Sequence, residues 1–399
     1  MGSSKSQSNS TQTSSTAQDS TVAAGNNVNL SATGADKNSD ITIRGSQVTA
    51  GSNVTLKADD AINLLAAQST AEQHSTNKSS SGSIGVSFGS QTGVTLAASQ
   101  GRGNADGTDV TYSNTHVEAG NILALQSGGD TTLKGAVASG KQVVADVGGN
   151  LNIESLQDTS NYESKQKSLG GSVTLGPSPS GSVSASKSKV DSSYASVIEQ
   201  SGIKAGDEGF QVEVAGNTGL KGAVIASTQA AIDQGLNRFQ TNGTLTITDI
   251  QNQANYSAKS VGANIGAGVS LDGKLAPSGS GAGMGKDSGD ASSTTQAGIS
   301  GIAGNTAVRT GDAETGIAKI FDADKVQKEI NAQMQITQAF GQQASKAVGD
   351  YVQGQRKTLQ DQIENATTET EKTTIQKQLS DLAMQERYCI DWGRAKLTA

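Results

Sequence analysis

A twenty-residue repeat is the feature that most restricts what this chain can fold into. Residues 117–133 and 137–153 carry the same pattern of apolar positions and glycines, offset by 20. The matched pairs are Val117 and Val137, Gly120 and Gly140, Gly129 and Gly149, and Leu133 and Ile153. Apolar residues alternate with polar ones within each copy, and the glycines fall where the chain must turn. This pattern is typical of one coil of a solenoid, whose inward side chains stack on those of the next coil.

The same spacing extends toward the N-terminus. Val28 and Val48 are 20 residues apart, and Ile41 and Ile62 are 21 apart. Gly-Asn and Gly-Ser pairs between the alternating segments suit tight turns. We therefore predict an all-β fold, an elongated parallel β-helix with hairpin excursions, over residues 21–276.

The composition fits a narrow solenoid better than a set of globular domains. The 399 residues include 49 Gly, and aromatic residues make up 3% of the chain. Aromatic rings supply much of the buried area of ordinary cores, so this chain has too few for several of them. The net charge of −7 is spread thinly, with no evident basic patch, which argues against nucleic acid as a partner. Cys389 is the single cysteine, so no intrachain disulfide is possible.

A longer repeat of about ninety residues is superimposed on the coils. The alternating segments 62–64, 151–153 and 245–247 lie 89 and 94 residues apart, and each precedes a polar excursion containing glutamine. Such excursions break the twenty-residue count, so we expect them to project from the coils. They are placed at residues 69–112, 158–198 and 252–276.

Each excursion contains short stretches of alternating apolar residues, which predict β-hairpins. An isolated hairpin is only marginally stable in water, so we expect these to fold back on the coils or to meet a partner surface. Stretches of about five to seven residues have one apolar face, as strands at an outer membrane do, but are shorter than a membrane-crossing strand. The candidate membrane- or partner-contact residues are Ile84, Val86, Phe88, Val94, Leu96, Val173, Leu175, Val183, Ile265, Val269 and Leu271.

Motifs that could carry chemistry are weak. The Gly-rich run 279–286 departs from a phosphate-binding loop at Ser280 and Asp287, so a linker is the preferred interpretation. His74 and His116 lack the neighbouring carboxylates or cysteines of a metal site. We expect His74 to be solvated and His116 to lie on a wall or corner of a coil.

No catalytic, cofactor-binding or metal-ligating residue is predicted, and we expect the chain not to be an enzyme. The acidic segment 101–109 lacks the spacing of calcium loops and is assigned to a polar turn. A solenoid hydrolase is the enzymatic alternative, but no acids repeat in register on adjacent coils, as its active site requires.

The two ends of the chain differ from the coils. Residues 1–20 are almost wholly polar and are expected to form a disordered lead-in. Residues 277–315 form a Gly/Ser-rich linker in this interpretation.

From about residue 316 the apolar spacing changes to three or four residues, which predicts an α-helical segment over 316–399. Ile317, Ile320 and Phe321 fall at the start of this pattern, and its first helix could break at a glycine. Thr368 and Glu371 form a capping box for the last helix. An apolar cluster near the C-terminus suggests that the segment belongs to a longer protein.

Several motifs together resemble a known family. Gly-Asn coils, the pentapeptide Leu-Lys-Gly-Ala-Val at 133–137 and 220–224, and Ser-rich excursions are similar to the haemagglutinin repeats of two-partner-secreted exoproteins. These are the filamentous haemagglutinin and contact-dependent growth inhibition (CdiA-type) families of Gram-negative bacteria. Residues 301–322 and 338–351 resemble the stretch that joins such repeats to the pretoxin region of CdiA-type toxins.

The resemblance implies a function. The full protein would be a long filament, secreted to the bacterial cell surface through an outer-membrane secretion partner, with a toxin domain in cis beyond Ala399. This region would engage the target-cell outer membrane, or a receptor in it, and help to translocate the toxin. The resemblance also implies a right-handed coil and no toxic enzymatic activity in this segment. The alternative is a filamentous haemagglutinin-type adhesin or stalk that binds a cell-surface receptor or glycan.

Overall fold

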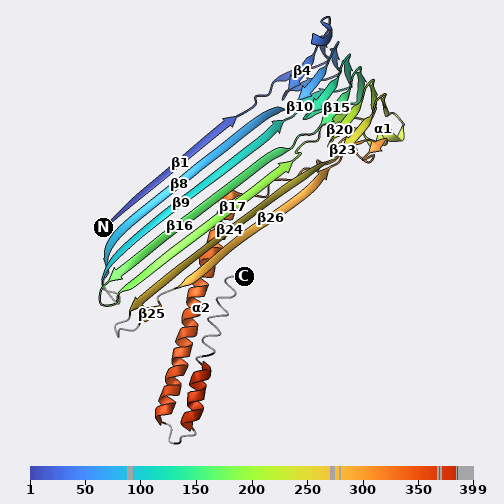
Figure 1. The fold of residues 1–399 in the computed structure, drawn as a ribbon. Helices are drawn as coiled ribbons and strands as arrows, with labels where there is room; N and C mark the ends of the chain where they lie inside the picture. Colours follow the sequence, from blue (N-terminus) through green and yellow to red (C-terminus); the bar gives the residue numbers. More distant parts are fainter. Residues whose placement is uncertain are drawn as a thin grey trace.

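Stacked coils, a long antiparallel sheet and a C-terminal helix make up the protein (Figure 1). The computed structural model describes residues 1–87, 93–269, 275–277, 280–365, 368, 371–382 and 384. The coils lie at one end of the long sheet, and the first part of helix α2 (Ala323–Asn365) packs on one of its faces, while the rest of the helix extends beyond the sheet. The all-β solenoid fold with a smaller helical part is thus confirmed.

The coils have three walls, each of them a parallel sheet. The first wall contains β2 (Thr21–Ala24), β5 (Gln47–Ala50), β10 (Thr115–Ala119), β13 (Ala136–Gly140), β18 (Gly202–Ala205), β21 (Val224–Ala226), β27 (Gly298–Ile299) and, antiparallel at its end, β28 (Ala303–Gly304). The second contains β3 (Val28–Ala32), β6 (Val54–Ala58), β11 (Ile122–Ser127), β14 (Gln142–Val147), β19 (Phe210–Val214) and β22 (Arg238–Thr241). The third contains β4 (Ile41–Arg44), β7 (Ile62–Leu65), β12 (Thr131–Lys134), β15 (Leu151–Glu154), β20 (Thr218–Lys221) and β23 (Leu245–Thr248).

Strand register confirms the twenty-residue coil on two walls. Leu123 pairs with Val143, and Leu133 pairs with Ile153, both offset by 20. On the first wall Val117 pairs with Ala138 rather than with Val137. The offset there is 21, because the corner between β13 and β14 is one residue shorter than the corner between β10 and β11.

Inward side chains of the walls form one continuous core. Alternate residues of β11 and β14 are buried, as expected for strands with one face toward the interior. Each fully buried Leu or Ile stabilises the fold by about 1.5–3 kcal/mol. The largest fully buried side chains are Leu56, Ile62, Leu64, Leu123, Leu125, Leu133, Leu151, Ile153, Ile203, Phe210, Leu220 and Ile225.

A hairpin leaves the coils at the end of the third wall in every second coil, after β7, β15 and β23. The ninety-residue unit is therefore two coils and one hairpin. The strands concerned are β8 (Ala67–Ser87), β9 (Gly93–Ser113), β16 (Asp158–Leu175), β17 (Ser180–Ser196), β24 (Ile250–Val269), β25 (Leu275–Pro277) and β26 (Gly281–Thr295).

The sequence predicted hairpins that fold back on the coils or meet a partner surface. The hairpins do not fold back on the coils but pair with one another. Their strands follow the order β8, β9, β16, β17, β24, and β24 then pairs with both β25 and β26. Most of them are 15–21 residues long, far more than the five to seven expected. Their proximal halves are rich in Ser, Thr, Asn and Gln, so they lack the apolar alternation that marks a strand in a sequence.

Three segments assigned to irregular structure are strands of this sheet. The expected lead-in contains β1 (Gly2–Ser15), which pairs with β8 along its whole length. The expected linker contains β26, which pairs with β24. Residues 101–109, assigned to a turn, lie within β9. Backbone pairing with a long neighbour stabilises these polar sequences without an apolar core of their own. The division of the chain into domains otherwise stays a prediction.

The helical segment begins later than expected. Asp322 caps α2 by accepting a hydrogen bond from the backbone N–H of Lys325 at 2.9 Å. Ile317, Ile320 and Phe321 therefore precede the helix and lie in extended chain against the sheet. α2 runs without a break through Gly341 and Gly349, the two glycines at which the sequence allowed one.

Residues 371–382 form the last described helical stretch. The predicted capping box is present: the Thr368 N–H donates to Glu371 Oε2 at 3.2 Å, and the Glu371 N–H donates to Thr368 Oγ1 at 3.3 Å. Cys389 lies outside the described residues. Within the described ranges, no helix combines the length and the apolar character that a membrane span requires.

Candidate functional site

The long sheet has one covered face and one open face. Side chains of a strand alternate between faces, and directly paired residues of antiparallel strands share a face. Along β24, Ala258 and Ser260 are buried on the covered face. Lys259, Val261 and Ile265 are exposed on the open face. The register of each strand pair assigns the remaining strands to the same two faces.

Helix α2 packs on the covered face, where glycines allow a close approach. A Cβ at Gly283 would lie 2.1 Å from the Met334 carbonyl oxygen, and one at Gly285 would lie 1.9 Å from that of Ile330. Ile330 is fully buried there. Residues 281–286 of the Gly-rich run that we assigned to a linker are thus the part of β26 on which the helix rests.

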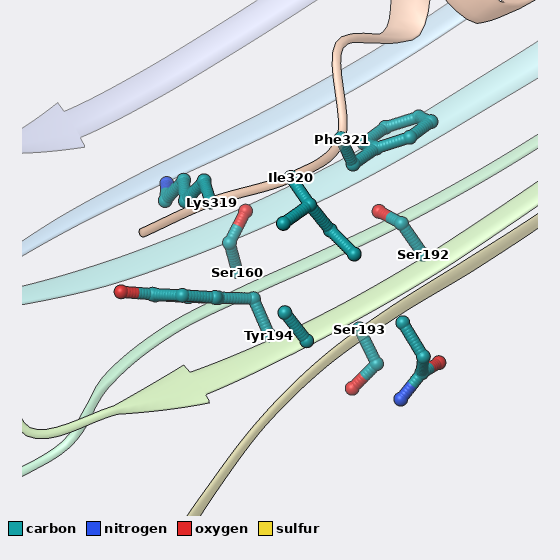
Figure 2. A pocket seen from close by; sticks show the side chains of 9 residues that line it. Ser160, Ser192, Ser193, Tyr194, Lys319, Ile320 and Phe321 are labelled. Atoms are coloured by element: carbon teal, nitrogen blue, oxygen red, sulfur yellow. The ribbon is translucent and has the colours of Figure 1, made fainter. Parts of the chain in front are cut away.

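The extended segment before α2 covers the same face nearer the coils (Figure 2). The Phe321 ring lies between Tyr162 and Tyr256, with centroids 5.4 and 5.6 Å away. The Tyr194 hydroxyl donates to the Ile317 carbonyl oxygen at 2.8 Å. Lys319 Nζ lies 2.7 Å from Asp109 Oδ1. These contacts fasten the chain between the solenoid and α2 to the sheet.

A small crevice remains beneath this segment. Lys319, Ile320 and Phe321 lie above it, and strands β16, β17 and β24 form its floor, with Ser160 and Tyr194 among the lining residues (Figure 2). Its described lining contains no carboxylate and no imidazole. The crevice therefore offers a serine without the base that would activate it.

The apolar tip is the distal part of the open face. Of the candidate residues, Phe88 and Leu271 lie outside the described residues, and Val269 is partly exposed. The other eight are 40–69% exposed. We define the apolar tip by these eight residues: Ile84, Val86, Val94, Leu96, Val173, Leu175, Val183 and Ile265.

Strand register brings the tip residues together from different hairpins. Ile84 pairs with Leu96, and Leu96 pairs with Val173 of the next hairpin. Val183 pairs with Ile265 of the third hairpin. Side chains paired in this way lie about 5 Å apart, and Val173 and Val183 are diagonal neighbours across β16 and β17. The two groups therefore form one surface. Three further exposed apolar residues lie on this face and were not predicted: Leu169, Val261 and Met284.

A band of cations crosses the open face between the apolar tip and the coils. We call it the basic belt. Its distal row, on strands β8, β9, β16 and β17, consists of Lys78, Arg102, Lys167 and Lys187. Its proximal row, on strands β16, β17, β24 and β26, consists of Lys165, Lys189, Lys259 and Lys286. All eight side chains are exposed.

Two lysines of the belt have ion-pair partners on their own strands. Lys165 pairs with Glu163, which raises the pKa of that lysine. Lys189 Nζ lies 2.8 Å from Asp191 Oδ2. The other six cations have no ion pair within the described part of the chain. The expectation of no basic patch was wrong. The basic belt draws its residues from six strands, and its first and last members, Lys78 and Lys286, are 208 residues apart in the sequence.

Among the described residues, the acidic groups of the open face lie on the coil side of the belt. His74 donates to the Asp106 carboxylate, and this hydrogen bond lowers the pKa of Asp106. His74 itself is 62% exposed, in agreement with its predicted solvation. Along the open face the order from the end of the hairpins is thus apolar, basic and then acidic. Within the described residues, no group of three or more His, Cys, Asp or Glu side chains is arranged to hold a metal ion.

His116 lies on the first wall of the coils, as predicted, and has an unexpected partner. Its Nε2 lies 2.8 Å from Glu199 Oε1, where the chain returns from the second hairpin. This hydrogen bond raises the pKa of His116, and burial of the ring opposes it. The pair links a coil wall to the base of the long sheet.

Comparison with known proteins finds similarity along most of the chain. A family model described as haemagglutinin repeat matches residues 1–169. Toxin CdiA of Escherichia coli is 40% identical over 361 residues, which cover 82% of this chain and 11% of that protein. The tRNA nuclease CdiA of Yersinia mollaretii is 37% identical over 345 residues, which cover 83% of this chain and 11% of that protein. The deoxyribonuclease CdiA of Dickeya dadantii is 43% identical over 274 residues, which cover 66% of this chain and 8% of that protein.

The chain spans about a tenth of the length of these relatives. No solved structure matches the chain significantly.

Proposed function

Since this chain belongs to the CdiA-type haemagglutinin-repeat exoproteins, we propose that it is a non-enzymatic delivery segment of such a toxin. In this proposal the long sheet engages the target-cell outer membrane and helps to translocate a C-terminal toxin. The full protein would reach the cell surface through an outer-membrane secretion partner.

The observation that supports this proposal best is the apolar tip. Eight apolar side chains, 40–69% exposed, gather at the end of a sheet that projects from the coils. Burying the exposed part of each in hydrocarbon is worth on the order of 1 kcal/mol. A concentrated apolar surface of this kind, exposed to water, marks a site of interaction with a membrane or another protein.

Strand length adds support. The sequence suggested strands too short to enter a membrane deeply, but β8 and β9 each contain 21 residues. At about 3.3 Å per residue, such a strand extends roughly 70 Å, more than twice the hydrocarbon thickness. The tip can therefore reach a target membrane while the coils remain well outside it.

The comparisons also fit a segment without enzymatic activity of its own. Two relatives of similar identity are named for different activities, a tRNA nuclease and a deoxyribonuclease. A segment shared by both does not account for that difference. A shared delivery task accounts for the similarity, with the toxin and its activity elsewhere in those longer proteins.

A vesicle experiment tests the proposal. We expect the 399-residue chain to float with outer-membrane vesicles, and the tip strands to be protected from proteinase K while the coils are cleaved. The triple variant Ile84→Ser, Leu96→Ser, Val173→Ser should bind at least tenfold more weakly, because it removes three exposed apolar side chains. Unchanged flotation of this variant would contradict membrane engagement by the tip.

A matched control replaces three exposed apolar residues of the coils and their connections. Ile198, Leu236 and Ile302 are 37–51% exposed and do not belong to the apolar tip. Their combined change to Ser should leave flotation unchanged. If both triple variants bound equally weakly, apolar exposure in general, and not the tip, would be responsible.

The adhesin alternative gains little from three tyrosines of the hairpins. Glycan binding commonly uses exposed aromatic faces, but Tyr162, Tyr194 and Tyr256 lie on the covered face against the segment before α2. Binding to whole cells with no binding to protein-free vesicles would favour this alternative.

A further inference from the structure

We propose that the basic belt binds the phosphate groups of anionic lipid headgroups, so that the open face docks obliquely on the membrane with the apolar tip inserted ahead of it. This inference rests on the proposed function, and it assigns the chemistry that the membrane must present. Its basis is the register of the strands, which places eight cations from three hairpins in two adjacent rows.

The belt concentrates like charge on a small surface. In the strand register Lys78 stands directly opposite Arg102, Arg102 opposite Lys167, and Lys167 opposite Lys187. Strands of a sheet are about 4.8 Å apart, and like charges directly opposite each other destabilise a sheet. None of these four has an ion pair among the described residues. An external anion is the partner that would relieve this repulsion.

The order of the zones matches the depth profile of a membrane. Val86 is eight residues beyond Lys78 on β8, or roughly 27 Å along the strand, and less than that in depth when the sheet is tilted. The hydrocarbon core is about 30 Å thick, and phosphates lie at its border. With the belt at the phosphates, the tip stays within the hydrocarbon, and the acidic groups near His74 stay on the water side.

The covered face makes this docking one-sided. Helix α2 and the Phe321 segment lie against it, and no described segment covers the open face. On strands β16 and β17 of the covered face, Ser168 and Ser186 are hydrogen-bonded to each other, as are Ser172 and Ser182. A sheet that is polar on one side and apolar with cations on the other suits an interface with water above and lipid below.

Cosedimentation of the full chain with two kinds of vesicle tests the belt. One is phosphatidylcholine alone, and the other contains 30% phosphatidylglycerol. The variant Lys78→Gln, Lys167→Gln, Lys187→Gln should bind the anionic vesicles about a hundredfold more weakly in 0.1 M salt, at about fivefold per charge. Its binding to phosphatidylcholine should be unchanged. The same three positions changed to Arg should retain binding, since the charge is kept.

The charge-matched control is Lys37→Gln, Lys57→Gln, Lys141→Gln, which removes three exposed lysines of the coils. It should change binding less than threefold. A belt variant that bound anionic vesicles as wild type does, while the tip variant lost binding, would overturn the belt and leave the proposed function standing. If the wild-type chain bound neither kind of vesicle, both the belt and the proposed function would be overturned. Equal losses in the belt and control variants would overturn the belt, because net charge alone would then explain the binding.

Discussion

The coils and the long sheet use β-strands in opposite ways. Coil strands are 2–6 residues long, are parallel except for β28, and turn their apolar residues into a shared core. Strands of the long sheet have up to 21 residues, are antiparallel, and expose apolar residues on the open face. The coils therefore depend on buried side chains, whereas the sheet depends on its backbone ladder and on the cover of α2. One chain thus stabilises itself through the buried core of the coils and keeps the apolar residues of the long sheet available for contact.

The largest difference should appear when one leucine is shortened in each region. Leu125→Ala in a coil should lower the free energy of unfolding by about 2–5 kcal/mol, because Leu125 is 1% exposed and its truncation leaves a cavity. Leu96→Ala in the sheet should change it by about 0.5 kcal/mol or less, because Leu96 is 45% exposed. Urea unfolding followed by circular dichroism measures both. A similar loss of unfolding free energy in the two variants would contradict the distinction between a coil core and an exposed sheet face.

A smaller effect is expected where the sheet depends on its helix. Gly285→Ala puts a methyl group against the Ile330 carbonyl oxygen and should cost about 1–3 kcal/mol in the packing of α2. Hydrogen exchange of residues 323–338 should then accelerate, while exchange in the coils stays the same. Gly85→Ala is the matched control, since nothing lies within 4 Å of its added Cβ. Equal exchange in both variants would show that α2 does not require the glycine.

The smallest expected effect is a pH dependence at the junction of the two regions. The pKa of His116 is raised above 6.5, so its contribution to stability is complete below pH 6.5 and is lost as the pH rises through the raised value. The pKa of Glu199 is lowered below 4.5, so its contribution is present above pH 4.5 and is lost as the pH falls through the lowered value. The pair should therefore stabilise the fold most between about pH 4.5 and 6.5.

Thermal unfolding at pH 6 and pH 8.5 checks this dependence. We expect a lower melting temperature at pH 8.5 in the wild type and a weaker pH dependence in both His116→Gln and Glu199→Gln. The two variants should behave alike because each removes the same hydrogen bond. A pH dependence as large in both variants as in the wild type would assign it to other groups.

The parts of the fold that the sequence predicted are those with apolar alternation. Leu133 and Ile153 established the coil length, and residues such as Ile84 and Val183 located the ends of the hairpins. β1 and β26 were missed because strands of Ser, Thr and Gly carry no such signal. The basic belt was missed for another reason: its members are far apart in the sequence, and only the register of antiparallel strands aligns them. Pairing polar stretches that flank the predicted hairpin ends would have revealed it.

The insertion of one hairpin in every second coil has a geometric consequence. Two coils lengthen the stack by about 9.6 Å, and the two strands of a hairpin widen the sheet by the same amount, since both spacings are about 4.8 Å. Stack and sheet therefore share one pitch. Further units of this kind would extend both without strain between them, and would prolong the apolar and basic strips in step. Avidity along such an edge would then grow with the number of repeats, with no change in any single contact.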